Sequence, residues 1–380
     1  SVSETMTSLT IFLLSLQLLS ISAFDFMQNF ENSFFEIQVD RDHPDNLYKE
    51  FEEFQVKYKR QYKDEIEKKF RFEQFVRSHN QVGKMNKKAE TSGHDTKFGI
   101  NKFSDRSKDE ISSMFSKVGP SNISQSNIPM FDMKNFRVKR QMEGLPKMFD
   151  LRNKKIGGRY IIGDIKNQGE CSCCWAFAAT SLAEVAYSVH LKKPVVLSDQ
   201  EVCDCAAKER PGCSGALPTD GLHYIKEMGL AKETEYEYSQ ERSTELGRCD
   251  AEKHERDLNP LMLDYYFIDP FNAEYIITHH LVQLNLPVSV AFKVGESLKW
   301  YKEGTLELAD CEDEKEQHWH SATIIGYGTS TNSAGRKVNY WILRNSWATD
   351  WGETGYARIV RGTDYCSMES HGNGARIPDE

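Results

Sequence analysis

The first 170 residues of this chain contain no cysteine, although the whole chain contains nine. Any disulfide framework is therefore confined to the part that begins at Cys171. An excess of positive charge is also missing. The formal net charge is −9, which argues against a nucleic-acid partner and against attraction to anionic membranes. No internal repeat is evident, so a solenoid or other repeat architecture is not expected.

Long hydrophobic runs are scarce as well. The apolar run Leu9–Ala23 has 15 residues, which is short for a membrane span and typical of a signal-peptide core. We expect Met6 to be the initiator and residues 1–23 to form a signal peptide cleaved after Ala23. An uncleaved signal anchor is the competing interpretation. Entry into the secretory pathway would permit disulfides in the back part of the chain.

The composition of the 380 residues, 39% hydrophobic and 28% charged, is that of a soluble globular protein. The length suits two or three domains, or one two-lobed enzyme with an extra segment. Apolar residues at helical spacing between 47 and 90 predict two amphipathic helices. Residues 98–105 are expected to run extended into a turn.

A polar segment at residues 116–130 is predicted to be a linker, and it contains the sequon at Asn122. The basic run Arg137–Arg140 follows shortly before Leu145. A short run of like charge is ordinarily solvated surface. Its position between the two parts of the chain favours a proteolytic processing site.

The most informative motif is the stretch from Gln168 to Phe177, which places Cys174 at the start of an apolar helix. A helix N-terminus is electropositive and stabilises a thiolate, so a cysteine there is a candidate nucleophile. Taken alone, the spacing of Cys171, Cys173 and Cys174 is also compatible with disulfides or a zinc site.

Three further segments complete a constellation. Residues 317–328 carry two histidines before an apolar strand, residues 340–356 contain Asn345 and Trp347, and residues 67–105 carry charged and aromatic side chains at helical spacing. From Leu145 onward the chain resembles the papain-like cysteine peptidases, and the part before it resembles their inhibitory propeptide. This resemblance implies an α+β fold with a helical lobe and a β-barrel-like lobe, preceded by a helical propeptide. The implied domains are residues 1–23, 24–144 and 145–380.

The resemblance assigns roles to individual residues. Cys174 is expected to be the nucleophile, and the Gln168 side chain to donate to the oxyanion. His320, six residues before Gly326, matches the catalytic histidine of the family, whereas His318 is two residues too early. Asn345 is expected to orient that imidazole. The remaining implied roles are shielding of this bond by Trp347 and a general acid–base function for His320.

The front part matches two signatures of the family's propeptides. Glu67, Arg71, Phe75, Val82 and Asn86 fall at the spacing of the helical signature, although Ser78 stands where an Asn is expected. The run from Gly99 to Asp105 matches the second signature. This pattern is closer to the cathepsin L-like branch than to the cathepsin B-like branch, and it implies that the chain carries its own inhibitor.

The resemblance also implies a disulfide pattern, which sequence alone cannot derive because six cysteines allow 15 pairings. The implied pairs are Cys171–Cys213, Cys205–Cys249 and Cys311–Cys366. Cys173 and Cys203 are then expected to be unpaired, with Cys203 buried as a small apolar residue. A free Cys173 beside the nucleophile would favour oxidative trapping. No metal and no cofactor are expected.

The substrate cleft departs from the family pattern at several positions. Ser172 and Cys173 replace the usual Gly-Ser, Ala216 replaces a Gly, Trp319 is bulky, and Ala348 replaces a Gly. Binding at Ala216 should survive if its backbone is not at positive φ. The substrate-binding residues implied by the resemblance are Gly215, Ala216, Leu217, Pro218, Ala291, Ser321, Trp347 and His371. The S2 pocket would also include His318, and its histidines suggest better acceptance of acidic P2 residues below pH about 6.5.

The sequence therefore predicts a cysteine endopeptidase zymogen, lysosomal or extracellular, activated by removal of the propeptide. Protein and peptide substrates, the chain's own propeptide and cystatin-type inhibitors are the expected partners. We expect no nucleic-acid partner and no membrane span in the mature form. We expect the mature form to be a monomer. The alternative is a catalytically impaired homologue that binds peptides or matrix partners, which the altered Ser172, Cys173 and Ala216 motivate.

Overall fold

The computed structural model describes residues 44–120, 127–131, 144–207, 212–239, 249–259, 262–311 and 317–378. The expected signal peptide, the sequon at Asn122 and the basic run Arg137–Arg140 lie outside these residues. Within them, no helix has the length and apolar character that crossing a membrane requires. The chain forms two compact units, residues 1–72 and 73–380.

The first unit holds α2 (Pro44–Lys57) and the beginning of α3 (Glu65–Thr91), which confirms the prediction of two helices. Aromatic side chains hold it together. The Phe51 ring, which is fully buried, stacks on Tyr62 at 5.9 Å and lies 5.3 Å from Phe72. On the surface of α3, Arg71 pairs with Glu67 one turn earlier at 3.3 Å.

In the second unit, the remainder of α3 and the residues after it pack on the body of the protein. Val82, Met85 and Ala89 are buried on one face of α3. The Asn86 side chain donates to the carbonyl of Phe98 and accepts from its N–H, at 3.0 and 2.9 Å. This clamp positions β1 (Lys97–Phe98), which pairs antiparallel with β9 (Tyr301–Glu303). Of the segment expected to be extended, residues 98–105, only Phe98 belongs to a strand, and a turn follows.

A short helix, α4 (Lys108–Ser112), follows this turn, and its start is closed by a reciprocal capping box. The Ser107 hydroxyl accepts from the N–H of Glu110, and the Glu110 carboxylate accepts from the N–H of Ser107. The chain leaves α4 directly into the residues that fill the cleft.

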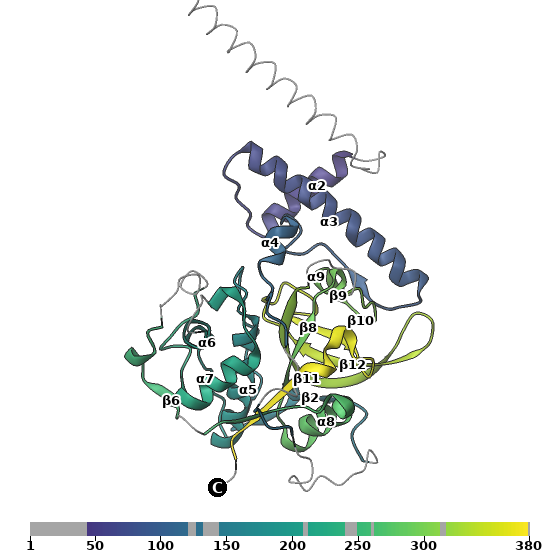
Figure 1. The fold of residues 1–380 in the computed structure, drawn as a ribbon. Coiled ribbons are helices and arrows are strands. Elements are labelled where there is room, and N and C mark those ends of the chain that lie inside the picture. The colour runs from purple at the N-terminus through teal and green to yellow at the C-terminus, as the bar shows by residue number, and fades with distance from the viewer. Residues whose placement is uncertain are drawn as a thin grey trace, which may run out of the picture. The chain divides into compact units, whose positions relative to one another are not determined.

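Helices form one side of the body of the second unit (Figure 1). The long helix α5 (Cys174–Leu191) is buried from Cys174 to Ser188, because most of its side chains are small or apolar and its acidic side chain, Glu184, pairs with Lys166 at 2.7 Å. Two helices pack against it, α6 (Asp199–Cys205) and α7 (Pro218–Met228). The Ser198 hydroxyl caps α6 by accepting from Glu201 N–H.

An eight-stranded sheet forms the other side, with strand order β10-β13-β12-β11-β8-β14-β7 and β2 (Phe149–Asp150) pairing with β11. The strands are β7 (Asp264–Phe267), β8 (Val288–Lys293), β10 (Thr305–Leu306), β11 (Trp319–Thr331), β12 (Lys337–Arg344), β13 (Tyr356–Val360) and β14 (Gly372–Arg376). Smaller elements are β3 (Lys155–Ile156), β4 (Arg159–Tyr160), β5 (Leu230–Ala231), β6 (Arg256–Leu258), α8 (Ala273–His279) and α9 (Glu296–Lys299). The predicted α+β fold with a helical and a β lobe is confirmed.

Four disulfides cross-link the second unit: Cys171–Cys213, Cys173–Cys203, Cys205–Cys249 and Cys311–Cys366. Three are the pairs that the resemblance implies. The expectation that Cys173 and Cys203 are unpaired was wrong. The start of α5 and the last turn of α6 pack together and bring the two sulfurs into bonding contact, which a separation of 30 residues in sequence conceals. Cys174 is the one free cysteine of the nine.

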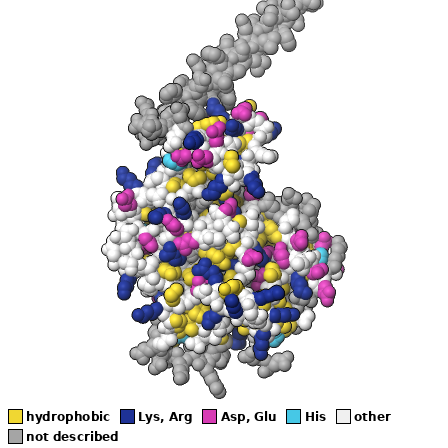
Figure 2. Space-filling model, turned by 180° about the vertical axis from the view of Figure 1, so that it is seen from behind, with side chains coloured by type: hydrophobic (Ala, Val, Ile, Leu, Met, Phe, Trp, Pro, Cys, Tyr) yellow, Lys and Arg dark blue, Asp and Glu magenta, His cyan; other side chains and the backbone are white. Residues whose placement is uncertain are grey.

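On the face of the molecule in Figure 2, basic and acidic side chains are interspersed, with apolar side chains between them. This mixed pattern accompanies the mildly acidic net charge of the whole chain. Among the described residues, this face has no large region of one sign that would steer a highly charged partner.

Candidate active site

Cys174 is the first residue of α5 and is completely buried. Burial raises the pKa of its thiol to about 11, although hydrogen bonds from the backbone and side chain of Ser321 and from the Trp175 backbone act in the opposite direction. The helix N-terminus also favours the thiolate. In this form of the protein, burial prevails and Cys174 is a neutral thiol at pH 7.

His320 and Asn345 lie side by side because strands β11 and β12 pair with Thr323 opposite Arg344. The His320 Nε2 and the Asn345 Oδ1 are 2.8 Å apart. An amide oxygen only accepts, so Nε2 carries the proton and Nδ1 is the basic nitrogen. Nδ1 is buried and has no hydrogen-bond partner among the described residues. Burial lowers the pKa of His320 to about 4, against the effect of Asn345, so the imidazole is neutral.

Aromatic rings enclose this imidazole. Trp347 lies 4.6 Å from the His320 ring, and Phe292 meets its edge at 5.7 Å. Trp347 is itself fully buried. Water is therefore kept from the hydrogen bond between His320 and Asn345, which strengthens that bond.

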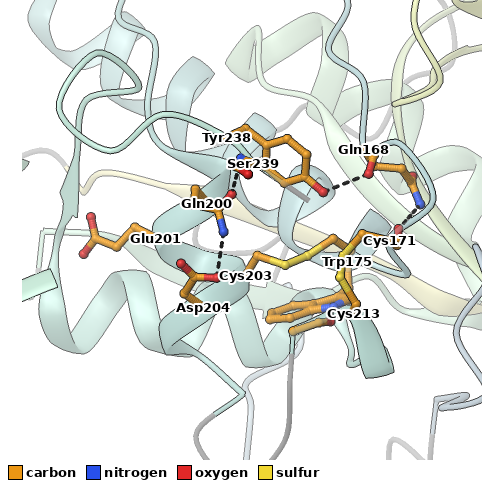
Figure 3. Close-up of a disulfide and its surroundings, with 12 residues drawn as sticks. Gln168, Cys171, Trp175, Gln200, Glu201, Cys203, Asp204, Cys213, Tyr238 and Ser239 are labelled. Carbon is orange, nitrogen blue, oxygen red and sulfur yellow. Dashed lines mark hydrogen bonds between the residues drawn. A yellow bond between two sulfur atoms is a disulfide. The ribbon is translucent and has the colours of Figure 1, made fainter. Parts of the chain in front are cut away.

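The Gln168 side chain is fixed from both ends and is fully buried. Its Oε1 accepts from the Ser346 hydroxyl at 2.6 Å, so its Nε2 is oriented as a donor. Nε2 donates to the backbone carbonyls of Cys171 at 2.8 Å and Met114 at 3.2 Å. Tyr238 holds the backbone by donating to the Gln168 carbonyl at 2.8 Å (Figure 3).

Residues of the front part fill the space between the two lobes. Ser116 exchanges two backbone hydrogen bonds with Trp319 on β11, at 2.9 and 2.8 Å. On its other side, Ser116 lies close to Gly215. A side chain at position 215 would collide with Ser116. The ring of Phe115 lies 5.8 Å from His320 and 5.6 Å from Trp347 and is buried. These contacts cover the His320 ring and occupy the space between β11 and Gly215.

The expected S2 residues come from both lobes. Ser321 and Ala291 are direct neighbours in the pairing of β11 with β8. His371 lies edge-on to Trp319 at 5.4 Å, and its Nδ1 is 2.9 Å from the Ser367 carbonyl. Leu217 and Pro218 begin α7 in the helical lobe, and Pro218 is buried. His318 is the residue before β11, and its carbonyl accepts a hydrogen bond from the N–H of Val294.

The departures from the family pattern have different structural consequences. Gly215 has φ +82°, while Ala216 is not at positive φ, so its N–H and C=O keep an ordinary geometry. Ala348 has φ +57°, a conformation that favours glycine. The Ser172 hydroxyl is buried and has no hydrogen-bond partner among the described residues.

Sequence reasoning missed the residues that occupy the cleft. Met114, Phe115 and Ser116 stand between the second propeptide signature and the polar linker, and only the bulky Phe115 distinguished them. Tyr238, which holds the Gln168 backbone, also gave no signal. Its partner is 70 residues away in sequence.

The comparisons with known proteins agree with this geometry. Residues 145–375 match the papain family of cysteine proteases, and residues 51–111 match the cathepsin propeptide inhibitor domain I29. The chain belongs to the papain family.

Relatives of this papain-family chain cover nearly all of its length. It is 32% identical to cysteine proteinase 3 of Solanum lycopersicum, over 84% of this chain and 82% of that protein. It is 28% identical to a cathepsin L-like proteinase of Phaedon cochleariae, over 83% and 90%. Among solved structures, a recombinant stem bromelain precursor has a TM-score of 0.70 at 27% identity, covering 88% of this chain and 100% of that one.

These findings establish the coarse function. The protein is the zymogen of a cathepsin L-like cysteine protease, a hydrolase of peptides. Its I29 propeptide is its own inhibitor. The contacts of Met114, Phe115 and Ser116 inside the cleft are the physical form of that inhibition.

Proposed function

We propose that Cys174 is the nucleophile and His320 the general base and acid of an endopeptidase. The observation that carries this proposal is the hydrogen bond of His320 Nε2 to Asn345, which leaves Nδ1 as the proton acceptor. Cys174 is the free cysteine and begins α5, where a thiolate is favoured. Ser321, the residue after His320, hydrogen-bonds the thiol and so ties Cys174 to this strand.

Removal of the propeptide would change the charge state of this pair. In the zymogen, burial keeps both the thiol and the imidazole neutral. Once Phe115 leaves, water and substrate reach the site, and the thiol proton passes to His320 Nδ1. The thiolate then attacks the peptide carbonyl, the imidazolium gives its proton to the leaving amine, and water hydrolyses the acyl-enzyme.

Gln168 would stabilise the oxyanion of this reaction together with the backbone N–H of Cys174. Its Nε2 already donates to a backbone carbonyl, that of Met114. A substrate carbonyl would take the place of this oxygen, and a donor at that position is worth about 2.7–4 kcal/mol in the transition state.

The domain boundaries are part of the same proposal. Residues 1–23 would be a signal peptide and residues 24–144 the propeptide, with the mature enzyme comprising residues 145–380. The match to the papain family begins at residue 145, which supports this boundary. Cleavage would occur between Arg140 and Leu145.

The S2 pocket would be walled by Leu217, Pro218, Ala291, His318 and Ser321, with His371 at its base. Trp319 would narrow this pocket, because its indole already meets the His371 ring. We expect aliphatic or aromatic P2 residues, with better acceptance of acidic P2 residues below pH about 6.5. Comparing P2 preference at about pH 5 and about pH 7 tests this, and an unchanged preference contradicts it.

The cellular setting is a further part of this proposal. The expected signal peptide and the four disulfides support a secreted or lysosomal enzyme. Glycosylation at Asn122, cystatin-type inhibitors and a monomeric mature form are further expectations.

A catalytically impaired homologue that binds peptides or matrix partners is the second candidate, favoured by the Ser172 hydroxyl, which is buried and has no hydrogen-bond partner in the part of the chain that the structure describes. Active-site titration decides between the two. The acid-processed protein is labelled with a thiol-directed epoxide, alongside Cys174→Ala. We expect one label per chain, lost in the variant, together with peptide hydrolysis. Labelling that persists in Cys174→Ala would defeat the assignment of the nucleophile.

A further inference from the structure

The last strand of the eight-stranded sheet carries an additional extended segment on its outer edge. Residues 127–131 run parallel to β7, with Met130 opposite Phe267. The N–H of Phe131 donates to the Phe267 carbonyl at 2.8 Å, and the N–H of Phe267 donates to the Pro129 carbonyl at 2.9 Å. Because β7 ends the strand order, this segment satisfies backbone groups of an edge strand.

Phe131 anchors this segment in an aromatic socket. Its side chain is only 6% exposed, whereas that of the adjacent Met130 is 41% exposed. The Phe131 ring lies 4.9 Å from Tyr266 and 5.6 Å from His280, both buried. These two backbone hydrogen bonds and the buried Phe131 ring therefore tie the segment to β7.

The floor of the socket is fixed before anything binds to it. The Tyr266 hydroxyl and His280 Nε2 are 2.7 Å apart, and His280 Nδ1 is 3.0 Å from the Leu286 carbonyl. A carbonyl accepts only, so Nδ1 carries the proton and Tyr266 donates to Nε2. Both ring orientations are set by these bonds, so the socket does not depend on Phe131 for its shape.

Open space surrounds the segment. A cavity of about 450 Å³ is lined by residues 127–131 together with residues of α7, β7 and β14. Its rim carries both signs of charge: Lys226 pairs with Asp264 at 2.9 Å, and Arg376 stands on β14. The groove therefore leaves open space beside the seated segment, and its rim does not demand one sign of charge.

This contact lies apart from the machinery of the family. Residues 127–131 fall between the I29 match, which ends at residue 111, and the papain match, which begins at residue 145. They belong to the part that processing removes. When the propeptide leaves, the Phe267 N–H and carbonyl and the socket beside Tyr266 become open.

We propose that the edge of β7 and the Phe131 socket form a peptide-binding exosite of the processed protease. Its ligand is an extended segment of a protein substrate that adds a strand to β7 and places an aromatic side chain against Tyr266 and His280. Residues 127–131 are the resident occupant in the zymogen. The inference rests on the proposed function only in requiring that processing release this segment.

The chemistry of the groove favours a peptide over other ligands. One backbone donor and one acceptor on Phe267 match the alternating groups of an extended chain, and strand addition of this kind gives affinity through the main chain. A single aromatic socket then supplies selectivity. Substrates with an aromatic residue in an unfolded region would be held near the cleft at raised effective concentration.

Binding to the full-length chain tests the exosite without using catalysis. The chain carries Cys174→Ala, which prevents self-processing, and the cleft stays filled by Met114–Ser116. A dye-labelled peptide of residues 126–132 is titrated by fluorescence anisotropy against this chain and against the same chain with Phe131→Ala. We expect at least tenfold tighter apparent binding to Phe131→Ala, because the tethered occupant no longer competes at its high effective concentration.

Three controls define the site. Met130→Ala, adjacent but exposed, should bind the peptide as weakly as the chain with its own linker intact. Peptides with alanine in place of the phenylalanine, or N-methylated at that residue, should bind Phe131→Ala at least tenfold more weakly than the parent. Hydrogen exchange at the Phe267 amide should slow when the parent peptide binds.

Equal binding of the parent and alanine peptides would overturn the proposal, and so would equal affinity for both chains. Dimerisation of Phe131→Ala in sedimentation would also overturn it, since β7 would then pair with a second copy. Failure of epoxide labelling at Cys174 would refute the proposed nucleophile and leave this result untouched.

Discussion

The Gln168 side chain donates from Nε2 to the backbone carbonyl of Met114 at 3.2 Å, so a propeptide oxygen occupies the position proposed for the substrate oxyanion. The same amide is held by Ser346 and by the Cys171 carbonyl. The donor is therefore oriented before the substrate arrives, and orienting it costs nothing during the reaction.

Gln168→Ala should lower kcat by about 10²–10³ with a small change in KM, because the lost hydrogen bond forms fully only in the transition state. Steady-state hydrolysis of a short peptide by the processed enzyme measures this. Tyr238→Phe, which removes only the bond to the Gln168 backbone, serves as the matched control and should lose far less. A loss confined to KM would contradict the oxyanion role.

The Cys173–Cys203 disulfide predicts one titratable thiol per chain after denaturation without reduction. Three thiols would show that these two cysteines are unpaired. Replacing both by alanine should lower the free energy of unfolding by about 2–4 kcal/mol, because the denatured chain gains conformational entropy when the loop is no longer closed by a disulfide. Cys203→Ser should instead leave a thiol beside Cys174 and make epoxide labelling sensitive to oxidants.

Ala348→Gly should stabilise the protein by about 1 kcal/mol. Ala348 has φ +57°, where a Cβ is strained and glycine is not, although glycine also gains freedom in the unfolded chain. Urea unfolding measures the change. Ala216→Gly is the matched control, since Ala216 is not at positive φ and should lose about 0.5–1 kcal/mol. Destabilisation of both variants alike would contradict the strain at Ala348.

The buried histidine of the exosite predicts acid sensitivity. Burial, with Arg376 nearby, lowers the pKa of His280 to about 4, while the Leu286 carbonyl acts in the opposite direction. The unfolded chain has an ordinary histidine pKa of about 6.5, so between about 6.5 and 4 it binds a proton that the folded chain does not. Stability therefore rises with pH through this window and is lost as pH falls, by at most on the order of 3 kcal/mol.

Urea unfolding across this pH range compares the wild type with His280→Gln. The variant should be less stable near neutrality but should lose less stability on acidification. His190→Gln, at an exposed histidine, should keep the wild-type pH dependence. A parallel pH dependence in wild type and His280→Gln would refute the assignment.

Motifs within short stretches of sequence carried most of the prediction. The apolar run after Cys174 predicted α5, and the apolar residues that follow the two histidines predicted the strand β11, because runs of apolar residues report which elements are buried. Cys174, His320 and Asn345 were chosen by residue type and spacing, and the pairing of β11 with β12 places the last two in hydrogen-bonding contact.

Contacts between segments far apart in the chain could not be predicted from the sequence. Cys173 and Cys203 meet because α5 and α6 pack, and no local pattern reports which helix ends touch. The polar composition of residues 116–130 predicted a linker. In the structure, Ser116 pairs with Trp319 and Met130 pairs with Phe267. An open edge strand accepts any extended backbone, so the sequence of the linker gave no sign of either pairing.

Residue types and their spacing predicted the proposed chemistry: a cysteine at a helix start, an imidazole and an amide at the spacing of a papain-family protease. The charge state of these groups depends on the packing around them. This packing buries the thiol, and it buries the imidazole beside Phe115, which keeps both groups neutral because a low-dielectric surrounding disfavours charge. It also decided where Phe131 lies, since a socket made by Tyr266 and His280 exists only after their strand and helix have packed.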